Sequence, residues 1–296
     1  MERRRAGKLL WIVLAFAIAA ASIIAAAVAL HFANQRELPI LMYHHLVPDD
    51  QEIQGDTIHI GQLKEELSIL KEQGYEAVTL QEVIDFAEGT GKLPKKPVCI
   101  TFDDGYLSNY ELGFPLLKEF DMKATIFVIG ATVGNKEFYK DTEFHITPHF
   151  DTAEMKEMAD SGLVLMQSHS FDLHQWAPFE TGDADQIRAN ILPLEGESDK
   201  EYAAAVTADF TRSKTELEAV TGQKVEAFAY PGGKYLDKSE ELLSSLGVKA
   251  TLTIEHGKNV VKRGKPETLR LLKRYYIADS TTEDVFRTWL DEKPAK

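Results

Sequence analysis

The segment VCITFDDGY occupies residues 98–106, and it determines the fold class that we expect for the chain. Residues 98–102 form a short, apolar, β-branched run, which predicts a strand buried on both faces. Asp103 and Asp104 end that strand. Two adjacent carboxylates at this point are costly unless positive charge lies nearby. We therefore predict that a bound cation takes one carboxylate as a ligand and leaves the other to act as a base, with an ordinary Asp-Gly turn as the alternative.

Segments with strand and helix character alternate on both sides of this motif. The alternation predicts an α/β fold with a parallel sheet, either open or closed into a barrel. In such folds functional groups gather at the carboxyl ends of the strands. Asp151 and Glu154 match a capping box at the start of one helix. The predicted strands are residues 38–43, 75–80, 98–102, 124–129, 163–166, 227–230 and 248–254, and the predicted helices end near Gly74, Phe86, Phe120, Gly162, Val220 and Leu243.

A second polar segment, HSFDLH, runs from His169 to His174 after a predicted strand. Histidine is the commonest neutral nitrogen ligand for zinc-like ions. Positions five apart on a regular helix diverge by about 140°, so the two imidazoles must come from a loop to share one ion. With Asp104 they supply two nitrogens and one oxygen, which leaves a coordination position for water, as in catalytic sites. Two structural or solvent-facing histidines are the alternative.

A third strand end carries the sequence FAYPGG, residues 228–233. A strand that ends in Pro-Gly-Gly brings its backbone close to whatever lies above the sheet. An exposed N–H there would donate to a developing oxyanion. Tyr230, Pro231 and Gly232 are therefore candidate substrate-binding residues, with a plain turn as the alternative.

The N-terminus predicts a membrane anchor. A basic segment, residues 1–8, precedes an apolar run, residues 9–30, which is longer than the ~7–15 apolar residues of a secretory signal and predicts a transmembrane segment at residues 9–31. Basic residues stay in the cytoplasm, so we expect a single-pass protein of the cell membrane. A linker, 32–37, would then lead to an extracellular catalytic domain, 38–296. Cleavage near residues 25–27, which would release a secreted form, is the alternative.

Composition and charge exclude some classes of partner and of structural support. The chain has 296 residues, with 44% hydrophobic and 27% charged residues, which are ordinary globular values. Its net charge of −14 argues against a nucleic-acid partner, because such binding needs a basic surface. Cys99 is the single cysteine, so the chain forms no internal disulfide. A domain of this length buries a sufficient core without one.

Taken together and in this order, the three polar segments resemble the polysaccharide deacetylases of the NodB-homology family (carbohydrate esterase family 4). TFDDGY resembles the first motif of that family, the histidine pair the second, and the aromatic-Pro turn the third. LMYHHL, KATIFVIG and DSGLVLMQSH extend the resemblance over residues 38–290. It implies a distorted (β/α)7 barrel, here preceded by one transmembrane helix. The implied activity is hydrolysis of N-acetyl groups from an extracellular amino-sugar polymer, with release of acetate.

The resemblance also implies a role for each residue. Asp103 would be the general base. Asp104, His169 and His174 would hold one divalent metal ion, Zn2+ in the first place and Co2+ or Ni2+ as alternatives. The ion and Asp103 would activate a water that attacks the acetamide carbonyl. The ion and the Gly232 N–H would stabilise the oxyanion.

Three features depart from the usual family pattern. The histidine spacing is five rather than four, which resembles the branch that acts on poly-β-1,6-N-acetylglucosamine of biofilms. Ala229 stands where an arginine usually orients the base, and Arg274 is a candidate substitute. Gly232 stands where an aromatic residue is common, so one wall of the site is expected to be open.

The general acid is the fourth departure, because the late Leu-x-Leu-His motif of the family is missing. The branch with the longer histidine spacing uses a histidine near the N-terminus instead, and His44 matches that place. His256, which also follows a predicted strand, is the alternative. His45 is expected to be a structural neighbour. His145 and His149 are expected to lie in a solvent-exposed loop.

Two other classes of protein fit part of this pattern. A non-catalytic glycan-binding protein would keep the barrel without the activity, and a metallo-phosphoesterase would use similar ligands around two metals. Metal stoichiometry separates the three, since one ion supports a deacetylase, two a phosphoesterase and none a binding protein. The sequence leaves the polymer open between poly-N-acetylglucosamine, cell-wall peptidoglycan and chitin-like oligomers.

Overall fold

The computed structural model describes residues 11, 14, 16–22, 34–53, 55–180 and 186–294. By their contacts, residues 1–36 and residues 37–296 form separate units. The predicted anchor, residues 9–31, lies mostly outside the described residues, although 11, 14 and 16–22 are helical. Among the residues that are described, no helix has both the length and the apolar character needed to cross a bilayer. The anchor therefore stays a prediction from the sequence.

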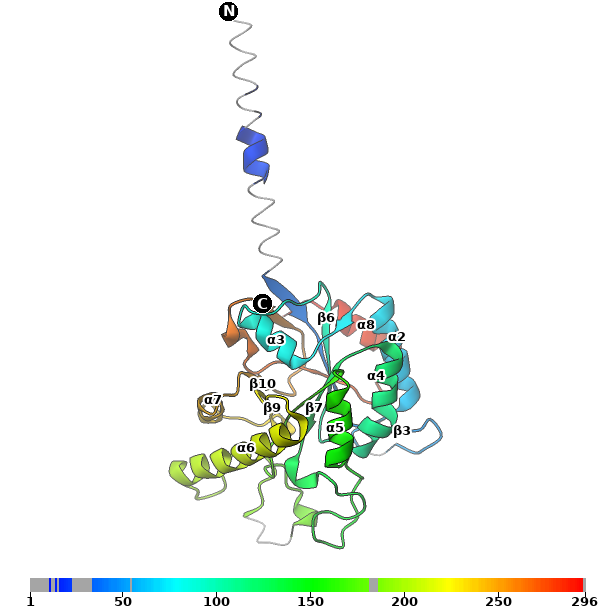
Figure 1. The fold of residues 1–296 in the computed structure, drawn as a ribbon, viewed down its shortest axis with the longest axis vertical. Coiled ribbons are helices and arrows are strands. Elements are labelled where there is room, and N and C mark those ends of the chain that lie inside the picture. Colours follow the sequence, from blue (N-terminus) through cyan, green and yellow to red (C-terminus); the bar gives the residue numbers. More distant parts are fainter. Residues whose placement is uncertain are drawn as a thin grey trace, which may run out of the picture. The chain divides into compact units, whose positions relative to one another are not determined.

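A parallel sheet forms the centre of the larger unit (Figure 1). In the described part of the chain its strands follow the order β10-β9-β8-β7-β6-β2-β12, with β5 also paired to β6. The strands of this sheet are β2 (Ile40–Tyr43), β5 (Glu76–Ala77), β6 (Pro97–Phe102), β7 (Ala124–Val128), β8 (Val164–Ser168), β9 (Ala227–Ala229), β10 (Ala250–Leu252) and β12 (Tyr275–Tyr276). Two short pairs lie outside it, β1 (Gln35–Leu38) with β11 (Asn259–Lys262) and β3 (His45–Val47) with β4 (Thr57–His59).

The sheet curls so far that its two ends meet. Leu252 of β10 forms a parallel bridge with Leu272, three residues before β12. The Leu272 N–H donates to the Thr251 carbonyl at 2.8 Å, and the Thr253 N–H donates to the Leu272 carbonyl at 2.9 Å. The chain therefore forms a distorted barrel, in agreement with the α/β class predicted from the alternation of strands and helices.

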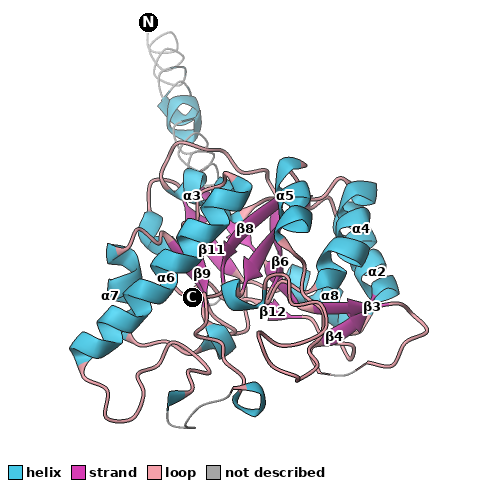
Figure 2. Cartoon of the chain, turned by 60° about the horizontal axis from the view of Figure 1, so that its bottom comes forward, coloured by secondary structure: helices cyan, strands magenta, loops and turns pink. Residues whose placement is uncertain are grey.

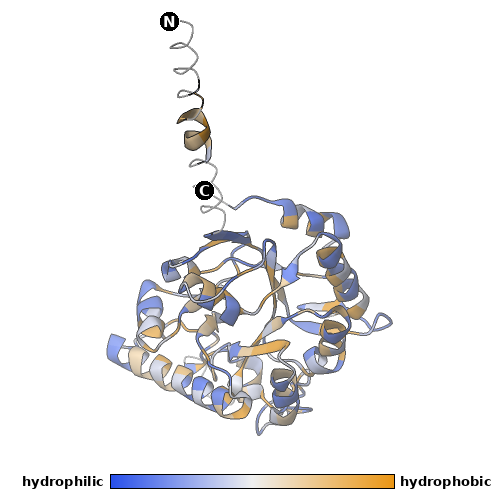
Figure 3. Ribbon diagram, turned by 45° about the horizontal axis from the view of Figure 1, so that its top comes forward, coloured by the Kyte–Doolittle hydropathy of each residue, from blue (hydrophilic) through white to orange (hydrophobic). Residues whose placement is uncertain are grey.

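Helices surround this barrel (Figures 2 and 3). They are α2 (Ile60–Glu72), α3 (Leu80–Ala87), α4 (Phe114–Phe120), α5 (Thr152–Asp160), α6 (Asp199–Thr221), α7 (Asp237–Ser245) and α8 (Glu283–Asp291), and a π-helical turn, Asn109–Gly113, precedes α4. The predicted capping box at Asp151 and Glu154 is confirmed at the start of α5. A second one, formed by Ser198 and Glu201, begins α6.

Alternate residues of each strand pack into different cores, because successive side chains point to opposite faces. In β6, Val98, Ile100 and Phe102 join the core that includes side chains of α2, α5 and α6. Cys99 joins a second core with Phe127, Leu165 and residues of α3. The residues of β6 are all buried, as the continuous apolar run predicted.

The structure differs from the predicted elements in two ways: one predicted strand is shortened by a helix cap, and several short strands and one helix were not predicted. Residues 75–80 form a strand only at Glu76–Ala77, because Thr79 caps α3 through a capping box with Glu82. The sequence did not predict the short strands β1, β3, β4, β11 and β12, nor the helix α8.

Candidate active site

The parallel register brings the ends of several strands to one edge of the barrel. Tyr43 of β2 pairs with Phe102 of β6, so His44 and Asp103 follow in adjacent positions. Val128 of β7 pairs with Ser168 of β8, directly before His169. A cleft of about 740 Å³ opens at this edge. Its lining contains nearly all the predicted site residues: His44, Asp103, Asp104, His169, His174, Tyr230 and Gly232.

Asp103 is buried and ion-paired with the equally buried Arg274. Arg274 Nη1 donates to Asp103 Oδ1 at 2.7 Å, and Arg274 Nε donates to the Thr253 carbonyl at 2.8 Å. Burial alone would raise the pKa of Asp103, but the charge of Arg274 and its hydrogen bond to the carboxylate outweigh burial, and the pKa falls to about 2. The carboxylate is therefore ionised at neutral pH. The guanidinium that the sequence suggested at position 274 does contact the candidate base.

Asp104 adopts the left-handed backbone conformation, with φ of 73°. This conformation is uncommon outside glycine, and strained backbone persists where the surrounding structure enforces it. Its Oδ1 lies 3.5 Å from His169 Nε2 and 3.8 Å from His174 Nε2, and it has no hydrogen-bond partner in the described part of the chain. A buried carboxylate oxygen that faces two imidazoles without bonding to either needs another partner.

The tautomer of His169 follows from its hydrogen bond. Its Nδ1 lies 2.8 Å from the Ala229 carbonyl, which can only accept, so Nδ1 carries the hydrogen. Burial lowers the pKa of His169 to about 4 and outweighs the pull of Asp103 and Asp104, so the ring is neutral. Nε2 then presents a lone pair to the space beside Asp104. A carbonyl that orients an imidazole in this way is the usual support of a metal-bound histidine.

His174 reaches the same space from an irregular loop, as the five-residue spacing required. Ser170 opens the loop in the left-handed conformation, with φ of 71°. Asp209 of α6 then accepts two consecutive backbone N–H bonds, from Phe171 at 2.8 Å and from Asp172 at 2.7 Å. Asp209 thereby fixes the turn between the two histidines.

Asp209 was not predicted from the sequence. Its helix buries Tyr202, Val206 and Phe210, and Asp209 precedes the last of these. An acidic residue beside the inward face of a long helix could have indicated a structural role. This pattern does not identify the loop whose N–H groups the carboxylate accepts.

Asp104, His169 and His174 fit a divalent metal ion. One ligand atom from each lies within 4.8 Å of the others. Ligand atoms about 2.1 Å from a tetrahedral ion would be roughly 3.4 Å apart, close to the 3.5 and 3.8 Å measured here. Two nitrogens and one oxygen match the ligand set of zinc hydrolases, and the unpartnered Asp104 oxygen would find its partner in the ion.

Of the two histidines that are candidate general acids, one lines the cleft and the other does not. His44 lines the cleft, its ring lies edge-on to Tyr276 at 5.8 Å, and its Nδ1 is buried with no hydrogen-bond partner among the described residues. His256 is about half exposed and packs against Tyr275 and Trp289, and it does not line the cleft. The geometry thus favours His44 over His256.

His45 and His149 complete the set of nearby histidines. His45 Nδ1 contacts Ser108 Oγ at 2.8 Å, as expected for a structural neighbour. The expectation that His149 is solvent-exposed is wrong, whereas His145 is exposed as expected. His149 packs against Tyr106 with ring centroids 4.9 Å apart, and burial lowers its pKa to about 4. The bridge between Tyr106 and His149 folds the loop back onto the barrel, which a polar loop composition does not reveal.

Of the Tyr230-Pro231-Gly232 turn, Tyr230 and Gly232 line the cleft, whereas Pro231 is not one of its lining residues. The Tyr230 hydroxyl donates to Glu240, so it is committed to the fold rather than to a ligand. Gly232 has φ of 58°, and a Cβ built there would meet no atom within 4 Å. A side chain at position 232 would therefore have open space around its Cβ, and the open wall of the site stays a prediction.

Comparison with known proteins agrees with this geometry. The family model described as Polysaccharide deacetylase matches residues 90–251, more than half of the chain. A Bacillus subtilis (strain 168) protein named "Putative polysaccharide deacetylase YxkH" is 29% identical over 223 residues, which cover 75% of this chain and 66% of that one. The poly-beta-1,6-N-acetyl-D-glucosamine N-deacetylase of Staphylococcus aureus (strain MSSA476) is 25% identical over 264 residues, which cover 89% and 82%.

Solved structures show the same fold. A de-N-acetylase from Aggregatibacter actinomycetemcomitans superposes with a TM-score of 0.72 at 24% identity, over 86% of this chain and 99% of that one. IcaB from Ammonifex degensii superposes with a TM-score of 0.67 at 26% identity, over 87% and 98%. With a candidate metal triad beside a buried Asp–Arg pair at the carboxyl edge of this barrel, the chain belongs to the polysaccharide deacetylase family, whose members are polysaccharide N-deacetylases.

Proposed function

We propose that this protein hydrolyses the N-acetyl groups of poly-β-1,6-N-acetyl-D-glucosamine and releases acetate, with peptidoglycan as the alternative polymer. The observation that carries the proposal is the triad of Asp104, His169 and His174 directly beside the ionised Asp103. The relatives named as poly-beta-1,6-N-acetyl-D-glucosamine N-deacetylases support the choice of polymer.

The triad would hold one divalent ion, Zn2+ in the first place, and this ion would supply a water of lowered pKa and polarise the acetamide carbonyl. Asp103 would then take the proton of that water at Oδ2. Arg274 holds Oδ1 at 2.7 Å, while Oδ2 lies 4.0 Å from His169 Nε2 and so faces the triad. Because the pair with Arg274 keeps Asp103 ionised, the base is ready at neutral pH.

Two further groups would act on the rest of the amide. The Gly232 N–H would donate to the oxyanion that develops on the carbonyl oxygen, since this glycine lines the cleft and leaves room above its backbone. His44 would give a proton to the leaving amine, which is otherwise a poor leaving group. Its position in the cleft with an unpartnered buried Nδ1 supports this role.

The same proposal places the enzyme at the outer face of the cell membrane, anchored by residues 9–31. The basic segment before the apolar run supports this orientation. A reporter fused after residue 32 should be extracytoplasmic, and the protein should stay in the membrane fraction. A mature N-terminus near residue 28 in the soluble fraction would show a cleaved signal instead.

The activity is tested with the full chain in mild detergent. Acetate release is measured from poly-β-1,6-N-acetyl-D-glucosamine and from peptidoglycan, before and after a chelator and after Zn2+ is added back. Release that the chelator abolishes and Zn2+ restores is the expected result, and the better substrate identifies the polymer. Glycan binding without acetate release from either polymer would overturn the proposal in favour of a non-catalytic binding protein.

A further inference from the structure

The candidate acid His44 lacks the support that orients the candidate ligand His169. The Ala229 carbonyl fixes the ring of His169 through Nδ1 at 2.8 Å. The Nδ1 of His44 is buried in the cleft wall and has no hydrogen-bond partner in the described part of the chain. Its ring packs edge-on against Tyr276, with centroids 5.8 Å apart. The direction of the His44 ring therefore depends strongly on how its backbone is held.

One segment of the chain, residues 103–109, holds the backbone at His44. The Asp103 N–H donates to the Tyr43 carbonyl at 2.9 Å. Asn109 Nδ2 donates to the carbonyl of His44 itself at 2.8 Å. A carbonyl can only accept, so this bond also fixes which end of the Asn109 amide faces His44. The segment that begins with the candidate base therefore also holds the proposed acid.

Ser108 extends the same support beyond His44. The Leu46 N–H donates to Ser108 Oγ at 3.0 Å, and His45 Nδ1 lies 2.8 Å from the same oxygen. The loop after β2 is thus bonded to the loop after β6 both at His44 and beyond it. A change at residue 109 would therefore be felt directly by the backbone of the candidate acid.

A π-helical turn carries Asn109 to this position. In the turn Asn109–Gly113, the Phe114 N–H donates to the Asn109 carbonyl, five residues back. Pro115 follows and has no N–H, so the ordinary α-helical bond to the carbonyl of residue 111 cannot form there. Such turns are rare and are frequently found at functional sites. The turn thus places at its first residue the side chain that reaches His44.

The bond between Asn109 and His44 is shielded from water. Asn109 is 2% exposed, so solvent does not readily replace its amide. A buried carbonyl that loses its donor costs about 1–3 kcal/mol unless the backbone moves to find another. Removal of Nδ2 would therefore shift the backbone of residue 44, and the imidazole would move with it.

We propose that Asn109 is a positioning residue for His44, which holds the imidazole where it can protonate the leaving amine. This inference rests on the proposed function and deepens it. Proton transfer requires the two heavy atoms to be about 2.6–3.2 Å apart, and a displacement of about 1 Å can cost 100-fold in rate. Asn109 acts through the His44 backbone and touches neither the substrate nor the ion. Because Asp103 lies on the same segment, one loop sets the separation between the base and the acid.

The test measures the effects of Asn109 and His44 singly and together, as acetate release from poly-β-1,6-N-acetyl-D-glucosamine by the full chain. Asn109→Leu removes the donor at similar volume, and it should lower kcat about 10- to 100-fold while KM changes less than about 2-fold. Metal content should stay at one ion per chain. In a His44→Ala background the same substitution should change kcat less than about 2-fold, because the group that it positions is gone. Asn109→Ala repeats the test without the bulk of leucine.

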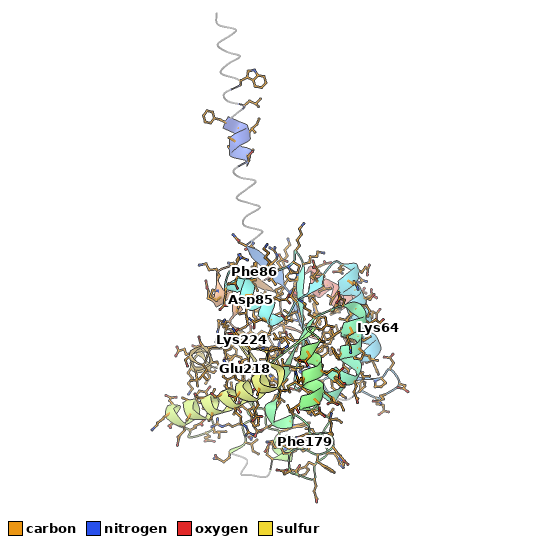
Figure 4. The ribbon with its side chains drawn as sticks, viewed as in Figure 1. Lys64, Asp85, Phe86, Phe179, Glu218 and Lys224 are labelled. Atoms are coloured by element: carbon orange, nitrogen blue, oxygen red, sulfur yellow. The ribbon has the colours of Figure 1, made fainter. Side chains whose placement is uncertain are left out.

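Gln223→Leu is the matched control. Like Asn109, Gln223 uses a side-chain amide to hold a strand backbone, since its Nε2 donates to the Val164 carbonyl at 2.8 Å. Val164 begins β8, whereas the cleft lies at the other end of the strands. Figure 4 labels Phe179, which lines the cleft, at the lower end of the domain, and Lys224, the residue after Gln223, above it. Gln223→Leu should lower stability in urea and keep kcat.

A second substrate separates the positioning of an acid from a general loss of structure. 4-Nitrophenyl acetate releases 4-nitrophenolate, which departs without a proton, so it does not need the acid. Its chelator-sensitive hydrolysis should therefore fall less than about 3-fold in Asn109→Leu. An equal loss with the ester and with the polymer would show that Asn109 supports the whole site, and it would overturn the positioning role.

Two other results would overturn it as well. One is an unchanged kcat in both Asn109 variants, and the other is a pair of losses that multiply when Asn109→Leu and His44→Ala are combined. In either case, acetate release by the unmutated chain would show that the proposed function still holds. Absence of acetate release by the unmutated chain would overturn the proposed function and the positioning role together.

Discussion

Arg274 donates a hydrogen bond of 2.7 Å to Asp103, and 171 sequence positions separate the two residues. Both side chains are buried, so the carboxylate depends on this guanidinium for its charge balance. The family resemblance expected an arginine at position 229, where the chain has alanine. Arg274, the residue directly before β12, supplies the positive charge instead, and its Nε also donates to the Thr253 carbonyl.

Arg274→Met should destabilise the fold and stop the reaction. The substitution leaves the Asp103 carboxylate buried without its partner, which typically costs about 3–5 kcal/mol. Urea unfolding measures the loss, and acetate release measures the activity. Arg287→Met is the control, because Arg287 pairs with Glu72 and Glu283 at the surface and should change stability by less than about 1 kcal/mol. Equal stability losses in the two variants would contradict the importance of the buried pair.

Substitutions of Asp103 and of Asp104 should have different effects on metal content and on activity. Asp103→Asn should keep one metal ion per chain and lose acetate release by a factor of about 10²–10⁴, the usual worth of a general base. Asp104→Asn and His169→Ala should lose the metal itself, measured by elemental analysis. Asp121→Asn is a matched control, since Asp121 is exposed and also left-handed, with φ of 51°. Full metal occupancy in His169→Ala would refute the ligand assignment.

Asp209→Ala should weaken metal binding without removing any ligand. Its carboxylate holds the two backbone N–H groups of the histidine loop, and partners of this kind typically contribute 10- to 100-fold in metal affinity. Activity should therefore be restored by excess Zn2+, which a merely unfolded variant would not show. Glu216→Ala, an exposed change on the same helix, should bind metal normally. Unchanged metal affinity in Asp209→Ala would show that the loop keeps its shape unaided.

His44→Ala should retain the metal and lose acetate release by about 10²-fold or more, because the leaving amine would lack its proton donor. His256→Ala should remain close to the unmutated chain, since His256 packs on Tyr275 and Trp289 away from the cleft. The reverse pattern, with His256 essential, would restore the usual family arrangement.

Glu66 should make stability depend on pH near neutrality. It is buried in α2 and accepts hydrogen bonds from Tyr43 at 2.7 Å and Gln62 at 3.0 Å. Burial raises its pKa from 4.5 to about 7, more than its hydrogen bonds lower it. The neutral form therefore stabilises the fold fully below pH 4.5, and this contribution is lost as pH rises through 7.

The size of that loss is on the order of 3 kcal/mol, at 1.36 kcal/mol per pKa unit. Glu66→Gln should remove this part of the pH dependence, as measured by urea unfolding between about pH 5 and 8. Glu241→Gln, at an exposed position of α7, is the control and should leave the pH dependence unchanged. Parallel stability curves for the unmutated chain and Glu66→Gln would rule out a raised pKa at this position.

The fold was predictable where burial leaves a strong local pattern. The apolar strand predicted at residues 98–102 and the long polar helix predicted to end near Val220 were recognised because each has a local sequence pattern that needs no knowledge of its neighbours. The short strands β1, β11 and β12 were missed, because two to four partly exposed residues become strands only when a distant segment pairs with them. Residues 75–80 were misassigned because a helix cap competes with an apolar run for the same residues.

The site was predictable to the extent that its residues directly follow buried strands. Asp103, Asp104 and His169 meet at one edge because parallel strands share a direction. Asp209 and the burial of His149 were not predictable, since both depend on how a loop folds back on the barrel.

The contact that closes the barrel lies close in sequence to the arginine that pairs with the candidate base. Between β10 and β12 the strands are joined through the bridge of Leu252 with Leu272, two residues before Arg274. The Thr253 carbonyl that binds Arg274 lies on the other side of this join. A transient opening of the Leu252–Leu272 bridge would move the guanidinium of Arg274 away from Asp103 while the rest of the molecule stayed folded. Thermal inactivation would then precede melting, and amide exchange at Leu272 would report how often each molecule passes through that inactive state.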